Sequence, residues 1–155
     1  MKCRHCAQPL TLPLLDLGSA PPSNAYLSPA ALHAPEVWYP LRVLVCQHCW
    51  LAQTEDHAGR EALFTDSYAY FSSYSSSWLA HARQYVQDMR TRLGLGAAST
   101  VVEVAANDGY LLQYVQQAGI PCYGIEPTAS TAAAARARGI AITERFFGVA
   151  LADEL

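Results

Sequence analysis

The sequence predicts an α/β protein in two parts, a small metal-binding module followed by the first half of a doubly wound parallel sheet. Two observations support this prediction. Four of the five cysteines stand in two Cys-x-x-Cys pairs, Cys3 with Cys6 and Cys46 with Cys49. Residues 97–155 then alternate between short apolar runs and helix-like stretches, in the order strand, helix, strand, helix, strand, which is typical of a βαβαβ unit.

The spacing of the cysteines favours a bound metal ion. A Cys-x-x-Cys turn directs two sulfurs at one point, and two such turns form the closed four-sulfur site that is usual for structural zinc. The alternatives are two disulfides, which need an oxidising compartment, and a redox pair, which would occur once at the start of a helix. His5 and His48 lie within the turns and could each replace a cysteine, but we expect them to be exposed beside the metal.

The composition argues against several classes of protein. Hydrophobic residues make up 52% of the chain and charged residues 15%, which is typical of a packed globular protein. A net charge of −3 and a pI of about 5.9 argue against a general nucleic-acid-binding protein. No apolar run approaches the roughly 18 residues of a membrane-spanning helix, and no secretory signal is recognisable. We therefore expect a cytoplasmic protein that binds neither nucleic acid nor membrane.

Residues 1–62 form the predicted metal-binding module. The gap between the cysteine pairs, 7–45, is longer than in the commonest zinc ribbons, so we expect it to fold back as a hairpin. Prolines punctuate the module and exclude a long helix. Three short strands are predicted, at 14–18, 39–46 and 51–54, and the first ends in a glycine turn. A module this small buries little apolar surface, so zinc is expected to supply most of its folding energy.

Residues 63–96 form a bridge with two different halves. The stretch 68–77 is rich in serine and reads as a flexible linker or a packed connector, but three tyrosines and a phenylalanine in ten residues argue against free flexibility. Apolar residues then recur at three- and four-residue intervals as far as Leu93. This pattern predicts an amphipathic helix that is capped by a serine and ended by Gly94 or Gly96.

Residues 97–155 form the predicted nucleotide-binding half-sheet. Strands are expected at 100–105, 121–126 and 140–143, and helices at 110–118 and 129–138. The first strand is apolar apart from Glu103, as in a parallel sheet that is buried on both faces. In a doubly wound sheet the ligand lies at the carboxyl ends of the strands, beside the first strand-to-helix turn, which here is 105–109.

The turn 105–109 favours a nucleoside ligand without phosphates. Gly109 and its small neighbours let the backbone approach a ligand closely, and Glu126, after the next strand, can accept hydrogen bonds from ribose hydroxyls. The turn has one glycine where a dinucleotide fingerprint has three, and Asp108 would repel a pyrophosphate. S-adenosylmethionine, with its amino acid and sulfonium, suits an acidic turn better. Asp108 could instead cap the following helix, and Glu126 could be an ordinary exposed strand end.

These residues resemble a known family. The loop from Glu103 to Gly109 is similar to the acidic-x-G-x-G-x-G loop of class I methyltransferases, with Ala105 and Asn107 in place of the first two glycines. With the cysteine pairs, the chain resembles the zinc-containing sugar C-methyltransferases, which transfer a methyl group to C3 of nucleotide-linked keto-deoxysugars. Further matching motifs are Leu17-Gly18, Asn24-Ala25-Tyr26-Leu27, Tyr39-Pro40-Leu41, Gln53 after the second cysteine pair, and Tyr68-x-Tyr70-x-Ser72-Ser73.

The resemblance implies a Rossmann-like fold and a role for each matching residue. A structural zinc ion would be held by Cys3, Cys6, Cys46 and Cys49. The S-adenosylmethionine site would comprise Ser72, Ser73, Glu103, Ala105, Asn107, Asp108, Gly109 and Glu126. Tyr68 or Tyr70 would lie near the reacting sugar carbon, where a tyrosine could hydrogen-bond the oxyanion of an enolate that attacks the sulfonium methyl group.

The resemblance also implies what residues 1–155 lack. The family has a catalytic histidine after a fourth strand and then a second α/β domain. Five histidines are present here, and none stands in that position: His5, His33, His48, His57 and His81. We therefore expect the N-terminal part of a methyltransferase that acts on a nucleotide sugar, inactive without a C-terminal half. The alternative is a non-enzymatic zinc-ribbon binding module with a remnant nucleotide fold.

Overall fold

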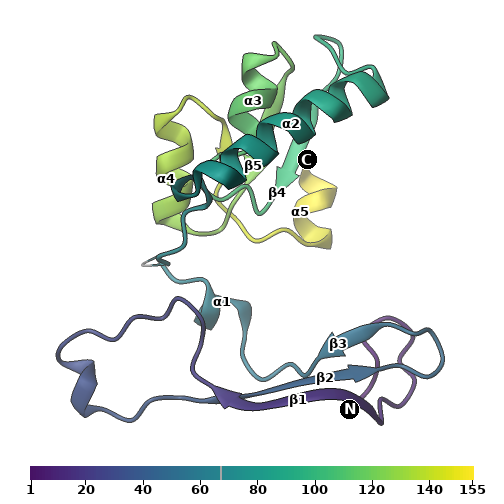
Figure 1. The fold of residues 1–155 in the computed structure, drawn as a ribbon, viewed down its shortest axis with the longest axis vertical. Coiled ribbons are helices and arrows are strands. Elements are labelled where there is room, and N and C mark those ends of the chain that lie inside the picture. Colours follow the sequence, from purple (N-terminus) through teal and green to yellow (C-terminus); the bar gives the residue numbers. More distant parts are fainter. Residues whose placement is uncertain (67) are drawn as a thin grey trace. The chain divides into compact units, whose positions relative to one another are not determined.

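The chain folds into two compact units, Met1–Leu63 and Phe64–Leu155, here called unit 1 and unit 2. The structure is a computed structural model, and it describes residues 1–66 and 68–155 (Figure 1). The helix at the end of the 63–96 segment belongs to unit 2. Among the helices of the described residues, none combines the length and hydrophobicity needed to cross a bilayer.

Unit 1 is built on a small antiparallel sheet in the order β1-β2-β3 (Figure 1). Its strands are β1 (Leu12–Ala20), β2 (Tyr39–Val45) and β3 (Ala52–Thr54), with a short 3₁₀ turn η1 (Ala31–His33) and helix α1 (Arg60–Leu63) outside the sheet. Because β1 and β2 pair along their length, the long insert between the cysteine pairs folds back as the expected hairpin.

Strand β1 is longer than the sequence predicted. The prediction ended the strand at a turn formed by Gly18, whereas the observed strand continues to Ala20. Gly18 has a φ of 76°, and the register with β2 shifts between Asp16 and Ser19. The Gly18 N–H donates to Asp16 Oδ1 at 2.9 Å. The glycine therefore forms an irregularity of the β-bulge type within the strand and does not end it.

The interior of unit 1 is small. Its buried cluster consists of Cys3, Leu10 and Cys46, with a few partly buried neighbours. Every residue of β1 is exposed. Trp38 and Trp50 are also exposed. Apolar burial is therefore a minor source of stability in this unit, which agrees with a dependence on metal binding.

Unit 2 contains a parallel sheet in the order β4-β5-β6, and the predicted βαβαβ unit is confirmed. The strands are β4 (Val101–Val104), β5 (Cys122–Ile125) and β6 (Ile142–Thr143). The helices are α2 (Ser76–Leu93), α3 (Leu112–Gln117), α4 (Ala129–Ala137) and α5 (Val149–Glu154), and a 3₁₀ turn η2 (Ser72–Tyr74) precedes α2. Helix α5 was not predicted. The mixed α/β fold class is confirmed.

Helix α2 has the predicted caps. Ser75 is the N-cap residue, and its hydroxyl accepts a hydrogen bond from the Trp78 N–H at 3.2 Å. Gly94 ends the helix with a φ of 63°, a left-handed conformation that glycine adopts at little cost. The buried residues of the helix, Ala82 and Val86, pack into the core of unit 2.

Strand β4 is exposed on one face, although the sequence predicted a strand buried on both. Val102 is 42% exposed and Val104 is 49% exposed. Val101, on the other face, packs against the core cluster to which α2 and α3 contribute. Within the described strands, β4 pairs with β5 alone and is therefore an edge strand. The apolar pattern predicted burial correctly for one face only.

Gly124, in the central strand β5, offers a test of this packing. A Cβ atom there would lie 2.5 Å from the Ala106 Cβ and 2.6 Å from the Ile142 Cδ1. Gly124→Ala should therefore lower the free energy of unfolding by about 1–3 kcal/mol. The control is Gly96→Ala, because nothing lies within 4 Å of a Cβ at that position. Urea denaturation measures both variants, and equal midpoints would contradict the packing described here.

Candidate metal centre and cofactor site

The four paired cysteines converge on one point in unit 1. The Sγ atoms of Cys3, Cys6, Cys46 and Cys49 all lie within 4.8 Å of one another. The closest pairs are Cys6 with Cys46 at 3.5 Å and Cys3 with Cys49 at 3.6 Å. A tetrahedral zinc ion with bonds of about 2.3 Å would hold its sulfurs roughly 3.8 Å apart. The cluster therefore fits zinc, and no disulfide joins these cysteines.

The two cysteine turns have the same backbone structure. In the first turn the Ala7 N–H donates to the Cys3 carbonyl at 2.9 Å, and in the second the Trp50 N–H donates to the Cys46 carbonyl at 2.9 Å. Ala7 and Trp50 have φ values of 59° and 64°, so each turn closes on a left-handed residue. This shared geometry aims both pairs of sulfurs at the same centre. His5 and His48 are exposed and outside the cluster.

Gln53 supports the cysteine cluster from β3. Its side chain is 6% exposed, its Nε2 donates to the Cys3 Sγ at 3.3 Å, and its Oε1 accepts from the Arg4 N–H at 3.0 Å. Hydrogen bonds from the Cys6 backbone and then from Gln53 lower the pKa of the Cys3 thiol to about 5. Gln53 therefore favours the thiolate form that binds metal. The sequence included Gln53 in a family motif without giving it a role.

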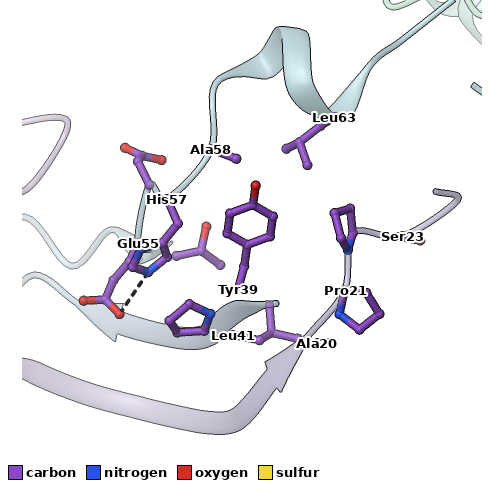
Figure 2. Close-up of a pocket in the computed structure, with 13 residues that line it drawn as sticks. Ala20, Pro21, Ser23, Tyr39, Leu41, Glu55, His57, Ala58 and Leu63 are labelled. Atoms are coloured by element: carbon purple, nitrogen blue, oxygen red, sulfur yellow. Dashed lines mark ion pairs between the residues drawn. The ribbon is translucent and has the colours of Figure 1, made fainter. Parts of the chain in front are cut away.

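Unit 1 also holds a hollow of about 410 Å³ that the sequence did not predict. Tyr39, at the first residue of β2, stands up from the strand toward Ala58 and Leu63 (Figure 2). His57 Nε2 lies 3.6 Å from the Glu55 carboxylate at its side. Because Cys46 follows the opposite end of β2, the hollow and the cysteine cluster are separated by the length of the strand.

In unit 2, the turn that follows β4 has the backbone of a glycine-rich loop. Ala105, Asn107 and Gly109 have φ values of 60°, 50° and 77°. These alternate positions are the ones at which the acidic-x-G-x-G-x-G pattern has its glycines. A Cβ on Gly109 would lie 2.4 Å from the Ile140 side chain, so the missing side chain at this position serves packing. The prediction that Gly109 lets the backbone approach a ligand closely stays a prediction.

The tyrosine- and serine-rich segment lies on this turn. We call residues 70–73 the strap. The Tyr70 carbonyl accepts from Asn107 Nδ2 at 3.0 Å, and the Ser72 N–H donates to Asn107 Oδ1 at 2.9 Å. The Ser73 N–H donates to Asp108 Oδ2 at 3.3 Å. The structure therefore brings together predicted site residues from 35 or more positions apart, and the strap is not a flexible linker.

Glu126 is buried at the end of β5. Its side chain is 5% exposed, so the alternative of an exposed strand end is wrong. Its Oε2 accepts from the Asn107 N–H at 2.9 Å, and its Oε1 accepts from the Thr128 N–H at 3.0 Å. Each carboxylate oxygen has a second lone pair, so the internal bonds leave acceptor capacity for a hydroxyl. The predicted ribose contact stays a prediction.

Asp108 does not cap the next helix. The N-cap of α3 is Leu111, and no side chain caps that end. Asp108 is 1% exposed, and its Oδ1 has no hydrogen-bond partner in the described structure. The Thr128 hydroxyl, equally buried, also lacks one. Glu103 Oε2 is a third such atom among the described residues. Buried polar atoms without partners are rare, and this group indicates where a polar ligand would bind.

The remaining predicted residues lie around the turn with different exposures. Tyr70 is exposed, whereas Tyr68 is half-buried with its ring 5.3 Å from that of Phe64. Glu103 is half-buried and hydrogen-bonded to Tyr110. Burial raises the pKa of Glu103 to about 8, and the charges of Asp108 and Glu126 act in the same direction. Glu103 is therefore a neutral carboxylic acid at pH 7.

The hydrogen bond from Gln53 to Cys3 predicts an effect on metal retention. Gln53→Leu removes the donor and should speed the loss of zinc to a chelator by about tenfold or more. Cobalt substitution should also show a shifted thiolate charge-transfer band, because the donor properties of one sulfur change. The matched control is the exposed Gln47→Leu. An unchanged rate and an unchanged spectrum would remove Gln53 from the metal centre.

The raised pKa of Glu103 predicts a pH dependence of stability. Between its ordinary value of 4.5 and its folded value of about 8, the unfolded chain ionises while the folded chain keeps the proton. Stability is therefore fully present below pH 4.5 and is lost as the pH rises toward 8. Glu103→Gln should abolish this loss, which amounts to a few kcal/mol at most, of order 1.4 kcal/mol per pKa unit.

The measurement is urea unfolding at pH 5 and pH 8.5, followed by helical circular dichroism, since the long helices lie in unit 2. Glu103→Gln should gain stability over the native sequence only at the higher pH. Glu144→Gln, at an exposed glutamate, is the control. A difference that is the same at both pH values would show that Glu103 is ionised in the folded state.

Comparison with known proteins finds similarity over both units of the chain. Residues 3–64 match the model of a family described as "Putative zinc binding domain". Over 154 residues the chain is 30% identical to the C-methyltransferase NovU of Streptomyces niveus. The match covers 99% of this chain and 36% of that protein, so the chain spans just over a third of the relative's length. Residues 3–64 are therefore similar to this zinc-binding domain, and the chain as a whole is similar in sequence to part of a C-methyltransferase.

Proposed function

We propose that the chain is the zinc module and cofactor half-domain of an S-adenosylmethionine-dependent methyltransferase that C-methylates a nucleotide-linked keto-deoxysugar. The observation that supports it most directly is the turn 105–109. It combines three left-handed residues with buried, unpartnered acceptors at the carboxyl ends of β4 and β5. Ligands bind at this place in doubly wound sheets. The relationship to a C-methyltransferase supports the same reaction class.

The residues of the turn suit a cofactor with a cationic amino-acid end. Asp108 would accept from the ammonium group with its free Oδ1, and the Thr128 hydroxyl would provide a further hydrogen bond. Glu126 would accept from ribose hydroxyls with the lone pairs that Asn107 and Thr128 leave open. When bound, S-adenosylmethionine supplies an electrophilic methyl group on sulfur.

Tyr70, in the strap, or Tyr68, two residues before it, would lie beside the substrate. Deprotonation of the carbon next to a keto group gives an enolate, and a tyrosine hydroxyl near that site would hydrogen-bond the developing oxyanion. The enolate carbon would accept the methyl group that the cofactor supplies, and the base would keep the proton that it removed. The exposure of Tyr70 supports this role, because its side chain is free to meet a ligand.

A further polypeptide segment would complete the site. Val102 and Val104 leave one face of β4 exposed, and β4 pairs with one strand only among those described. We expect a C-terminal half to pair with this edge and to supply the base for catalysis.

The cysteines without disulfides fit a reducing compartment, hence the cytoplasm, and the net charge of −3 fits a protein that does not bind nucleic acid.

Titration calorimetry with S-adenosylhomocysteine tests the proposal. Glu126→Ala should weaken binding by about 1–3 kcal/mol, the cost of leaving ribose hydroxyls unpaired. An analogue with a 2′,3′-dideoxyribose should lose less affinity than S-adenosylhomocysteine on this change. Its loss measures the damage to the turn, since Glu126 also accepts from the Asn107 and Thr128 N–H groups. Glu144→Ala, an exposed glutamate, is the control. If S-adenosylhomocysteine does not bind, the methyltransferase proposal fails, and a non-enzymatic zinc-binding module becomes the better description.

A further inference from the structure

We infer that Arg138 is a positioning residue that locks the strap and Asp108 together, so that Asp108 presents its free oxygen to the ammonium group of the cofactor. This inference rests on the proposed function, since it concerns the same site. Arg138 was not among the residues that the sequence singled out. It directly follows α4, 30 positions after Asp108, and only the fold brings the two together.

The contacts of Arg138 join three segments of unit 2. One terminal nitrogen, Nη1, donates to the Ser73 hydroxyl at 2.8 Å and to the carbonyl oxygen of Asp108. The same nitrogen lies 3.3 Å from Asp108 Oδ2. A single guanidinium therefore contacts both the main chain and the side chain of the turn, as well as the side chain of the strap. Loss of this group would release the strap and the turn from each other.

Electrostatics explain why a cation is needed at this position. Asp108 is 1% exposed, and a buried carboxylate without a paired cation is strongly destabilising. Arg138 is the cation that pairs with Asp108 in the described part of the chain. The guanidinium is planar and always charged, and a single one of its nitrogens lies against three acceptors here.

The same contacts decide which oxygen of Asp108 is available. Oδ2 accepts from the Ser73 N–H and faces Arg138, whereas Oδ1 has no partner in the described structure. With Oδ2 held in this way, the carboxylate cannot rotate freely, and Oδ1 is the acceptor left for a ligand. A cationic donor is the natural partner of such an oxygen.

The test compares two ligands in the protein and its variants. S-adenosylhomocysteine carries the amino-acid end, and 5′-methylthioadenosine lacks it. Arg138→Met should weaken binding of S-adenosylhomocysteine by about tenfold or more and leave 5′-methylthioadenosine binding nearly unchanged. Arg138→Lys, which keeps the charge, should show an intermediate loss. Arg136→Met is the matched control, because Arg136 contacts Glu144 and the Ile142 carbonyl and not the turn.

The outcomes separate this inference from the proposed function. If the native protein binds S-adenosylhomocysteine and Arg138→Met weakens both ligands equally, or neither, the positioning role is wrong while the cofactor site stands. If the native protein binds neither ligand, the proposed function fails, and the inference fails with it. Arg138→Lys keeps the test decisive if Arg138→Met does not fold, as judged by circular dichroism.

Discussion

The turn after β4 must hold three left-handed residues within five positions, and much of unit 2 is arranged to keep it there. Ala105 is not a glycine, and a left-handed conformation costs roughly 1–2 kcal/mol at such a residue, whereas Asn107 adopts it more readily. Buried hydrogen bonds offset this cost: Glu126 accepts from the Asn107 N–H, and the strap binds the Asn107 side chain. The backbone of the turn is therefore fixed before any ligand arrives.

Unit 1, in contrast to unit 2, has almost no hydrophobic core. Two of the three residues in its buried cluster are cysteines, Cys3 and Cys46, so the metal site and the core are the same place. Its two left-handed residues, Ala7 and Trp50, close the cysteine turns. In unit 2 buried carboxylates hold the strained backbone, whereas in unit 1 thiolates and a metal ion would do so. This difference explains why β1 can be exposed along its whole length.

Local signals made much of this structure predictable from the sequence. Ser75 and Gly94 cap α2 as the pattern indicated, and the cysteine spacing predicted the cluster. The predictions that failed concern residues whose structure depends on partners distant in sequence. The bulge at Gly18 depends on pairing with β2, and the exposure of Val102 depends on which strands flank β4. The contacts of Arg138 could not be predicted either, because a single arginine after a helix belongs to no recognisable sequence pattern.

The hydrogen bonds show which residues fix the geometry of the site and which remain available to bind a ligand. Both the oxygen and the nitrogen of the Asn107 side-chain amide are hydrogen-bonded to the strap. The N–H groups of Ser72 and Ser73 donate hydrogen bonds to the turn. These groups fix geometry, and a ligand that needed them would have to break the strap's attachment. Asp108 Oδ1 and the Thr128 hydroxyl, in contrast, are buried and have no partner among the residues that the structure describes. Preorganisation of this kind lowers the entropy lost on binding, and it makes selectivity depend on a few free atoms whose positions other residues set.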